Sequence, residues 1–90
     1  MPIKQIQKEI RVVNACDIRY HPLNPRRNIR SAKMVAKSIL AYGYINPIVV
    51  DEEGIILAGN TRFRALEMLG VNEFDVLVVK GLTEQEKLVF

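Results

Sequence analysis

The chain has 90 residues, of which 49% are apolar, and this suits one globular domain with a single core rather than a disordered chain. No apolar run reaches the roughly 20 residues that a membrane-spanning helix needs, and the N-terminus lacks the apolar stretch of a secretory signal. One cysteine (Cys16) and one histidine exclude an internal disulfide framework and a zinc site built within this chain. We therefore expect a cytoplasmic protein with no membrane contact and no bound structural metal.

The positive charge is concentrated in one part of the chain, although the net charge is only +3. Residues 18–50 hold six of the 13 basic residues and none of the 10 acidic ones, so the remainder is net negative. The six are Arg19, Arg26, Arg27, Arg30, Lys33 and Lys37. This asymmetry predicts a positive surface that faces a nucleotide, a nucleic-acid backbone or both, against the alternative of a solvated basic face.

In the first half of the chain we expect one strand and one long helix. The β-branched stretch at 9–13 predicts a strand, and Asn14 is placed to cap the short turn after it. Two prolines make 19–28 a loop. Apolar residues at helical spacing predict a helix over 31–42, which Gly43 ends.

In the second half, two short apolar runs at 46–50 and 54–58 flank an acidic turn. They predict a β-hairpin, or two adjacent strands, buried on both faces. A further buried strand is expected at 74–79. Thr83 and Glu86 have the spacing of a capping box and predict a last helix. We expect a single domain over residues 1–90, which is either complete or continues into a C-terminal region.

The segment "LAGNTRFRALEMLG" (57–70) places two arginines where a helix begins. Gly59 allows a tight turn, the helix starts at Asn60 or Thr61, and its first acid is Glu67. Acids normally favour the positive end of a helix, so arginines at this end indicate an external anion, for which phosphate is the natural candidate.

Helical geometry separates the two arginines. Arg62 shares a stripe with Leu66 and Leu69 and should lie at the mouth of the buried face. Arg64 lies about 200° further round the helix and points elsewhere. We expect Arg62 to contact phosphate, and Arg64 either to reach a second phosphate or to pair with an acid.

Several motifs in order resemble the ParB/sulfiredoxin superfamily, from about residue 9 to residue 88. They are "NPRR", "SILAYGYINPIVV", "GIILAGNTRFRALEMLG" and "FDVLVVKGLTEQE". The resemblance implies an α/β (α+β) fold of the ParB N-terminal type, a small mixed β-sheet with packed helices. Asn60 stands where sulfiredoxin has its catalytic cysteine, so the chain is not expected to be a sulfiredoxin.

The resemblance also implies a site for a nucleoside triphosphate, with CTP or ATP as candidates and Mg²⁺ as a possible companion. The residues implied to bind the nucleotide are Gly59, Asn60, Thr61, Arg62, Arg64, Arg26, Arg27 and Ser38. The process implied is DNA-associated, such as plasmid, phage or chromosome partition or its regulation, with DNA contacted directly or through a partner and a homodimer as a candidate state.

Other activities have weaker support in the sequence, and no catalytic residue is assigned. Nucleotide hydrolysis is left open, and a small-molecule kinase is less favoured. A ParB-like nuclease would need converging carboxylates, whereas the adjacent acids at 51–53 should diverge on their turn. The main alternative to nucleotide binding is binding of the DNA backbone through Arg19, Arg30, Lys33 and Lys37.

Overall fold

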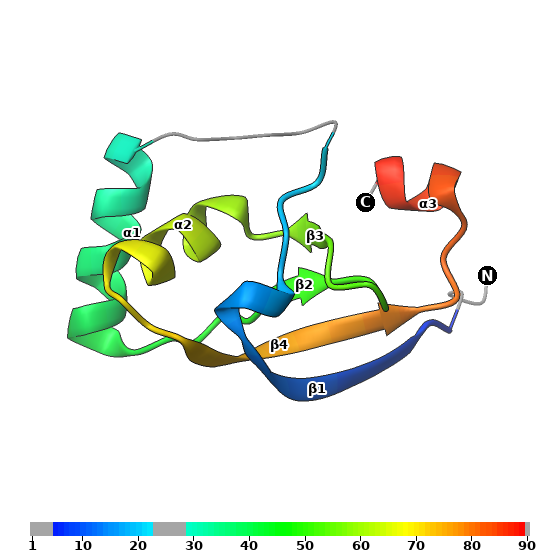
Figure 1. Ribbon diagram of the computed structural model, residues 1–90, viewed down its shortest axis with the longest axis horizontal. Coiled ribbons are helices and arrows are strands. Elements are labelled where there is room, and N and C mark those ends of the chain that lie inside the picture. Colours follow the sequence, from blue (N-terminus) through cyan, green and yellow to red (C-terminus); the bar gives the residue numbers. More distant parts are fainter. Residues whose placement is uncertain (1–4, 23–28, 90) are drawn as a thin grey trace.

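A four-stranded mixed sheet forms the centre of the fold in the computed structural model, which describes residues 5–22 and 29–89. Its strands in spatial order are β1 (Gln7–Asn14), β4 (Glu73–Lys80), β2 (Ile48–Val50) and β3 (Ile56–Ala58). β4 is antiparallel to β1 and parallel to β2, and β2 and β3 form the expected hairpin (Figure 1). The predicted mixed sheet with packed helices is confirmed.

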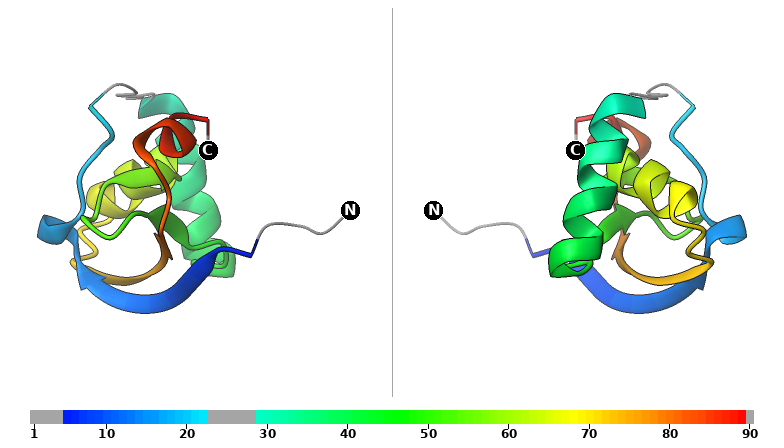
Figure 2. Two further views of the ribbon diagram at one scale, coloured as in Figure 1. Left: turned by 90° about the vertical axis from the view of Figure 1, so that its right-hand side faces the viewer. Right: turned by 90° about the vertical axis from the view of Figure 1, so that its left-hand side faces the viewer.

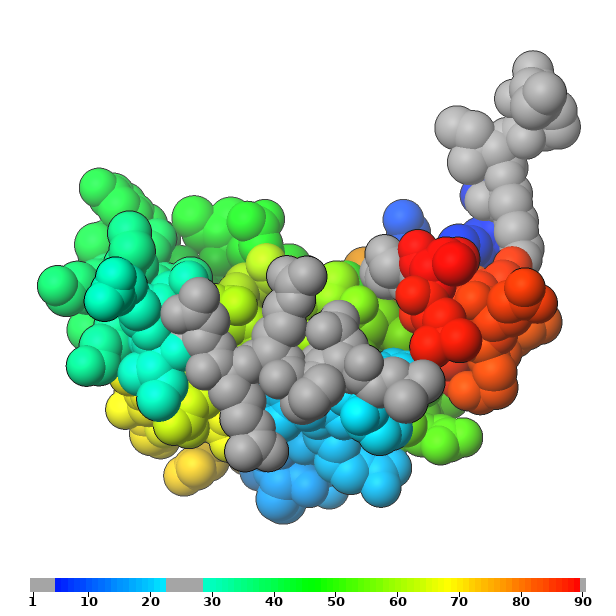
Figure 3. All heavy atoms as spheres, turned by 90° about the horizontal axis from the view of Figure 1, so that it is seen from above, coloured from blue at the N-terminus to red at the C-terminus, as the bar shows by residue number. Residues whose placement is uncertain are grey.

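The helices lie to one side of the sheet, which curves around them (Figure 2). They are the 3₁₀ turn η1 (Ala15–Asp17) and the helices α1 (Ile29–Tyr42), α2 (Asn60–Met68) and α3 (Glu84–Leu88). α1 packs on α2, and α2 in turn contacts β2. α1 and α3 lie at opposite ends of the molecule (Figure 3).

The core lies between α2 and the inner face of the sheet. Phe74, Val76 and Val78 alternate along β4 and are buried with Phe63 and Leu66 of α2. This alternation follows from the two-residue period of a strand. β2 and β3 are shorter than predicted, and their outward residues Val49 and Leu57 are only half-buried, so the expectation that the hairpin is buried on both faces is wrong.

Local signals set most of the helix ends. Gly43 follows α1 at φ +93°, and its N–H donates to the Ile39 carbonyl at 2.8 Å, as a helix-ending glycine does. The capping box of α3 is also present, with the Thr83 hydroxyl and the Glu86 carboxylate each accepting the other residue's backbone N–H. In contrast, the Asn14 side chain makes no capping bond to η1, so that part of the prediction is wrong.

A buried carboxylate organises the acidic β2–β3 turn. Asp51 is only 2% exposed, and its Oδ1 accepts the N–H groups of Glu53 at 2.8 Å and Ile55 at 3.0 Å. Its Oδ2 lies 3.1 Å from Nζ of Lys87 on α3. This ion pair ties α3 to the hairpin turn, which a sequence pattern could not show because the partners are far apart in the chain.

We expect Asp51→Asn to lower the free energy of unfolding at neutral pH by about 2 kcal/mol, because a buried ammonium loses its charged partner. Burial raises the pKa of the Asp51 carboxyl, but bonds from the Ile55 N–H and from Lys87 outweigh burial and lower its pKa below the usual value. The stability that it adds is therefore complete above about pH 4 and is lost as the pH falls further.

Urea unfolding of both proteins over a pH series measures this difference, which should narrow below about pH 4. Glu84→Gln is the matched control, because Glu84 contacts the same ammonium at 3.3 Å but its side chain is 89% exposed. We expect it to cost less than about 0.5 kcal/mol. A difference that did not change with pH would contradict the proposed role of the Asp51 charge.

Candidate functional site

The turn into α2 is built around a glycine in a left-handed conformation. Gly59 precedes the helix at φ +108°, a conformation that residues with a Cβ rarely adopt. A Cβ at this position would lie 3.0 Å from Nη2 of Arg62 and 3.2 Å from Cγ1 of Ile48. Glycine is therefore needed both for the turn and for the close approach of the Arg62 guanidinium to the backbone.

The first turn of α2 contains an arginine and lacks the acid that usually stands at the start of a helix. In addition, Gly59 offers no side chain to cap the helix. The N–H groups of a first turn, together with the helix dipole, make this end positive. Asn60 and Thr61 occupy the turn and are half-buried, which places them beside any anion bound there.

Arg62 lies at this positive end, and one of its buried nitrogens has no hydrogen-bond partner in the described part of the chain. The nitrogen concerned is its Nε. Its Nη2 lies 3.5 Å from the Pro47 carbonyl oxygen, which is at the long limit of a hydrogen bond. Since a guanidinium carries five N–H donors, this arrangement can still bind an oxyanion.

A hollow of about 260 Å³ between α1 and the start of β2 brings Arg62 together with a second predicted residue, Ser38. The other residues that line it are Val35, Ile39, Gly43, Tyr44, Ile45 and Asn46. Sequence reasoning did not single out Asn46 or Tyr44 as site residues. The only signal for them was their position between the glycine that ends α1 and the following strand.

Tyr44 fixes one wall of this hollow. Its hydroxyl donates to the Asp75 carbonyl at 2.8 Å and accepts the Ile48 N–H at 2.7 Å. Burial raises the pKa of the Tyr44 hydroxyl above its ordinary value, so this group stays protonated at neutral pH. Both of its hydrogen bonds are to backbone groups, so Tyr44 holds the start of β2 in place beside Arg62.

Arg64 lies at a different hollow, as its position on the helix predicted. This hollow of about 380 Å³ is lined by Arg64, Tyr20, Ile29 and Glu67. Nη1 of Arg64 is 3.9 Å from Oε1 of Glu67, and the Tyr20 hydroxyl donates to the same carboxylate oxygen at 2.6 Å. Of the two expected roles, the structure therefore shows pairing with an acid. Arg26 and Arg27 lie outside the described residues.

The basic residues of the alternative site fall into two places. Arg30, Lys33 and Lys37 are exposed on α1 at a spacing that puts them along one side of the helix. Arg19 lies apart from them, where its backbone pairs with the residues around β3 in an isolated bridge to Ile55. The first three can form a continuous basic stripe, and Arg19 belongs to another surface.

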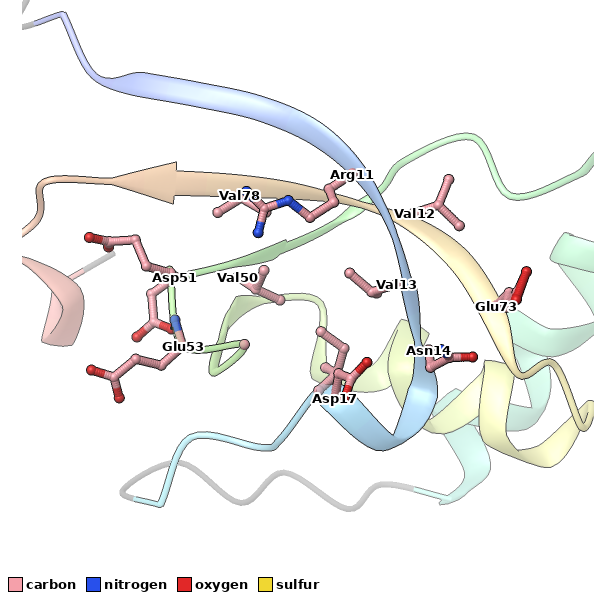
Figure 4. A pocket seen from close by; sticks show the side chains of 13 residues that line it. Arg11, Val12, Val13, Asn14, Asp17, Val50, Asp51, Glu53, Glu73 and Val78 are labelled. Atoms are coloured by element: carbon pink, nitrogen blue, oxygen red, sulfur yellow. Dashed lines mark hydrogen bonds between the residues drawn. The ribbon is translucent and has the colours of Figure 1, made fainter.

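A larger hollow of about 460 Å³ on the inner side of the sheet is electrostatically unsuited to phosphate. Figure 4 shows Arg11 from β1, Asp17 from η1, and Asp51 and Glu53 from the hairpin turn around it. Its lining carries five acids and one arginine, and that arginine pairs with Glu9. Within residues 5–22 and 29–89, no three His, Cys, Asp or Glu side chains are grouped to hold a metal ion.

Comparison with known proteins identifies the family. Residues 2–90 match the family model described as the ParB N-terminal domain. The chain belongs to the ParB N-terminal domain family. The predicted resemblance is confirmed, and none of the described helices is long and apolar enough to cross a bilayer.

Two relatives match segments of different length in this ParB domain. It is 42% identical over 53 residues to the ParB-like nuclease domain-containing protein YnaK of Escherichia coli, covering 59% of this chain and 61% of that protein. It is 36% identical over 81 residues to a probable chromosome-partitioning protein ParB of Rickettsia felis, covering 88% of this chain and 28% of that one.

Among solved structures, it is similar to the C-terminally truncated ParB of Caulobacter crescentus complexed with CTP-γ-S. The TM-score is 0.72 at 26% identity, over 90% of this chain and 49% of that one. This ParB domain therefore spans less than two thirds of the length of each of these three proteins.

We expect Gly59→Ala to destabilise the domain more than Gly70→Ala. Both glycines have positive φ, which costs an alanine about 1–2 kcal/mol. At Gly70 a Cβ meets no heavy atom within 4 Å, whereas at Gly59 it presses on Arg62 and Ile48. Urea unfolding should show the larger loss at Gly59, and equal losses would contradict a close contact between this backbone and Arg62.

Proposed function

We propose that this ParB domain binds a nucleoside triphosphate, with the phosphates on the first turn of α2 and Arg62 as the principal ligand. The observation that carries the proposal is the Arg62 guanidinium, whose buried Nε lacks a partner in the described chain, at the uncapped positive end of a helix. A bidentate anion would supply the hydrogen bonds that this guanidinium lacks and would thereby bind with favourable free energy.

The surrounding residues supply the rest of the phosphate site. The backbone turn at Gly59, with Asn60 and Thr61 in the first helical turn, offers N–H and side-chain donors. Ser38 lines the same hollow as Arg62. Arg26 and Arg27 are proposed to add positive charge. Arg64 is proposed to support them, because its 3.9 Å contact with Glu67 is weak on a partly exposed surface and phosphate could replace it.

CTP is the first candidate nucleotide, because a structural relative is a ParB complexed with CTP-γ-S, and ATP is the second. Mg²⁺ would accompany either, since it commonly binds through substrate phosphates with few protein ligands. We propose that binding serves a DNA-associated process such as partition or its regulation, on the support of a relative that is a probable chromosome-partitioning protein.

Calorimetric titration with CTP, ATP, GTP and UTP in the presence of Mg²⁺ tests the proposal. We expect one nucleotide to bind and Arg62→Ala to weaken that binding by about 10- to 100-fold, the value of one or two charged hydrogen bonds. Lys33→Ala is the control, because this exposed residue of α1 does not line the Arg62 hollow and should change the affinity by less than about threefold.

Absence of binding by all four nucleotides, or equal losses in the Arg62 and Lys33 variants, would contradict the nucleotide site. Correct folding of each variant is checked by its unfolding midpoint, so that a loss of affinity is not confused with a loss of structure.

A second candidate function is binding of the DNA backbone, which the exposed basic stripe of Arg30, Lys33 and Lys37 favours. Contacts with phosphates release counterions, so the affinity for duplex DNA should fall with salt by a slope of about 0.9 per contact. We expect Lys33→Ala/Lys37→Ala to reduce that slope by about 2 in fluorescence anisotropy. Arg62→Ala should leave it unchanged, and the reverse pattern would refute a DNA role for the stripe.

A further inference from the structure

β1 forms an edge of the sheet that the described chain leaves open. The strand pairs with β4 along its whole length, from Gln7 opposite Lys80 to Asn14 opposite Glu73. No strand lies on its other side among residues 5–22 and 29–89, and Figures 1 and 2 show β1 along the rim of the sheet. In an antiparallel strand every second residue points its N–H and C=O away from the paired neighbour, so β1 keeps a row of groups that can bind a further strand.

The opposite edge of the sheet does not offer such a row. Beyond β3, the Arg19 carbonyl accepts the Ile56 N–H at 2.9 Å, and the Arg19 N–H donates to the Gly54 carbonyl at 2.9 Å. This isolated bridge covers the edge of β3 with the chain's own backbone. β3 also has only three residues, whereas β1 has eight. Within the described part of the chain, β1 is therefore the edge that suits an added strand.

The outer face of β1 is apolar and exposed. Val13 stands opposite the buried Phe74 and packs against the core, so its side chain lies on the inner face of the sheet. Ile10 and Val12 are an odd number of positions away and point outward, because side chains alternate along a strand. They are 60% and 63% exposed. An added strand can cover this surface with apolar side chains of its own.

On its inner side β1 borders the acidic hollow, the space of about 460 Å³ between the sheet, η1 and the hairpin turn (Figure 4). Arg11 and Val13 of β1 line it. Of its five acids, Asp51 is neutralised by Lys87. The other four are exposed and have no ion-pair partner within residues 5–22 and 29–89: Asp17, Glu52, Glu53 and Glu73. The acidic hollow therefore carries a surplus of negative charge.

The open edge and the acidic hollow together define the chemistry of a strand that fits. On the outer face its apolar side chains would cover Ile10 and Val12, and on the inner face a lysine or arginine beside Val13 would reach the unpaired carboxylates. A second copy of β1 lacks this pattern, because its inner face carries Glu9 as well as Arg11 and brings no net positive charge. The occupant that complements both faces is an extended basic segment with alternate apolar residues.

We propose that β1 binds an extended segment of another protein in which apolar residues alternate with lysine or arginine. The segment adds to the sheet as a further strand, its backbone pairs with that of β1, and its cations face the acidic hollow. The proposal does not rest on nucleotide binding, since it uses neither Arg62 nor the first turn of α2.

Capped peptides of about seven residues, the length of an ordinary strand, test the proposal by calorimetric titration. We expect a peptide that alternates lysine and valine to bind. A peptide with the same residues in two separate blocks should bind at least about 10-fold more weakly, because it cannot present one apolar and one basic face. A peptide that alternates glutamate and valine should lose as much, because it brings like charge to the acidic hollow.

Methylation of the peptide backbone separates strand pairing from simple charge attraction. Alternate N–H groups of an added strand point toward β1, and the others point to solvent. Of two peptides, N-methylated at every valine or at every lysine, one should bind at least about 10-fold more weakly and the other within about threefold of the parent. In NMR hydrogen exchange on the protein, the parent peptide should slow alternate amides of β1.

Removal of charge from the acidic hollow tests the role of its carboxylates. Asp17→Asn/Glu53→Gln should weaken binding of the alternating lysine–valine peptide by about 3- to 10-fold at low salt. Asp75→Asn/Glu84→Gln is the matched control, because it removes the same charge from two exposed acids that do not line the acidic hollow. It should change the affinity by less than about twofold. The unfolding midpoint of each variant controls for loss of fold.

Binding that one set of N-methyl groups abolishes and that Asp17→Asn/Glu53→Gln weakens would support the proposal. No binding at up to about 1 mM peptide would overturn it, as would equal binding of the block peptide or equal effects of the two methylated peptides. An affinity unchanged by Asp17→Asn/Glu53→Gln would overturn the choice of a basic segment. Alternate β1 amides that become protected as the concentration of the protein alone rises would show a second copy at this edge, and would also overturn the proposal.

Discussion

The close packing of the Arg62 guanidinium against the backbone at Gly59 is the constraint on which the candidate site depends. It requires a residue without a Cβ, and it holds an arginine at the positive end of α2, where like-signed electrostatics disfavour it. A cation kept in an unfavourable field, with a buried nitrogen that no described residue bonds, is a cost that folding alone does not explain. The nucleotide phosphates proposed to bind here would offset that cost.

The rest of the fold can be understood as support for that junction. Ile48 of β2 packs closely against Gly59. Tyr44 fixes the start of β2 through two hydrogen bonds to the backbone. The C-terminal end of α1 and the loop after it complete the hollow. Five of the ten acids line the larger hollow, most of them on the hairpin turn, so the two hollows differ in the sign of their charge. A triphosphate and a cationic partner would be drawn to different parts of its surface.

Sequence reasoning succeeded where the signal was local. The helix that Gly43 ends, the capping box of α3 and the divergence of Arg62 from Arg64 all depend on residues a few positions apart. It failed at Asp51, because the ammonium that makes its burial tolerable comes from Lys87 on another element. The proximity of Ser38 and Arg62 was available only through the family resemblance, since spacing within one segment cannot report how α1 and α2 pack.

The ion pair between α3 and the hairpin turn has a consequence for how the domain opens. α3 has only five residues and contributes none of them to the hydrophobic core, and so short a helix is marginal in water without tertiary contacts. Its order therefore depends on tertiary contacts such as the Lys87–Asp51 ion pair, and Asp51 also holds the turn by accepting two N–H bonds. Helix and turn should detach as one cooperative unit at lower free energy than the sheet, so a partly open state differs from the closed one in the C-terminal helix and the β2–β3 turn alone.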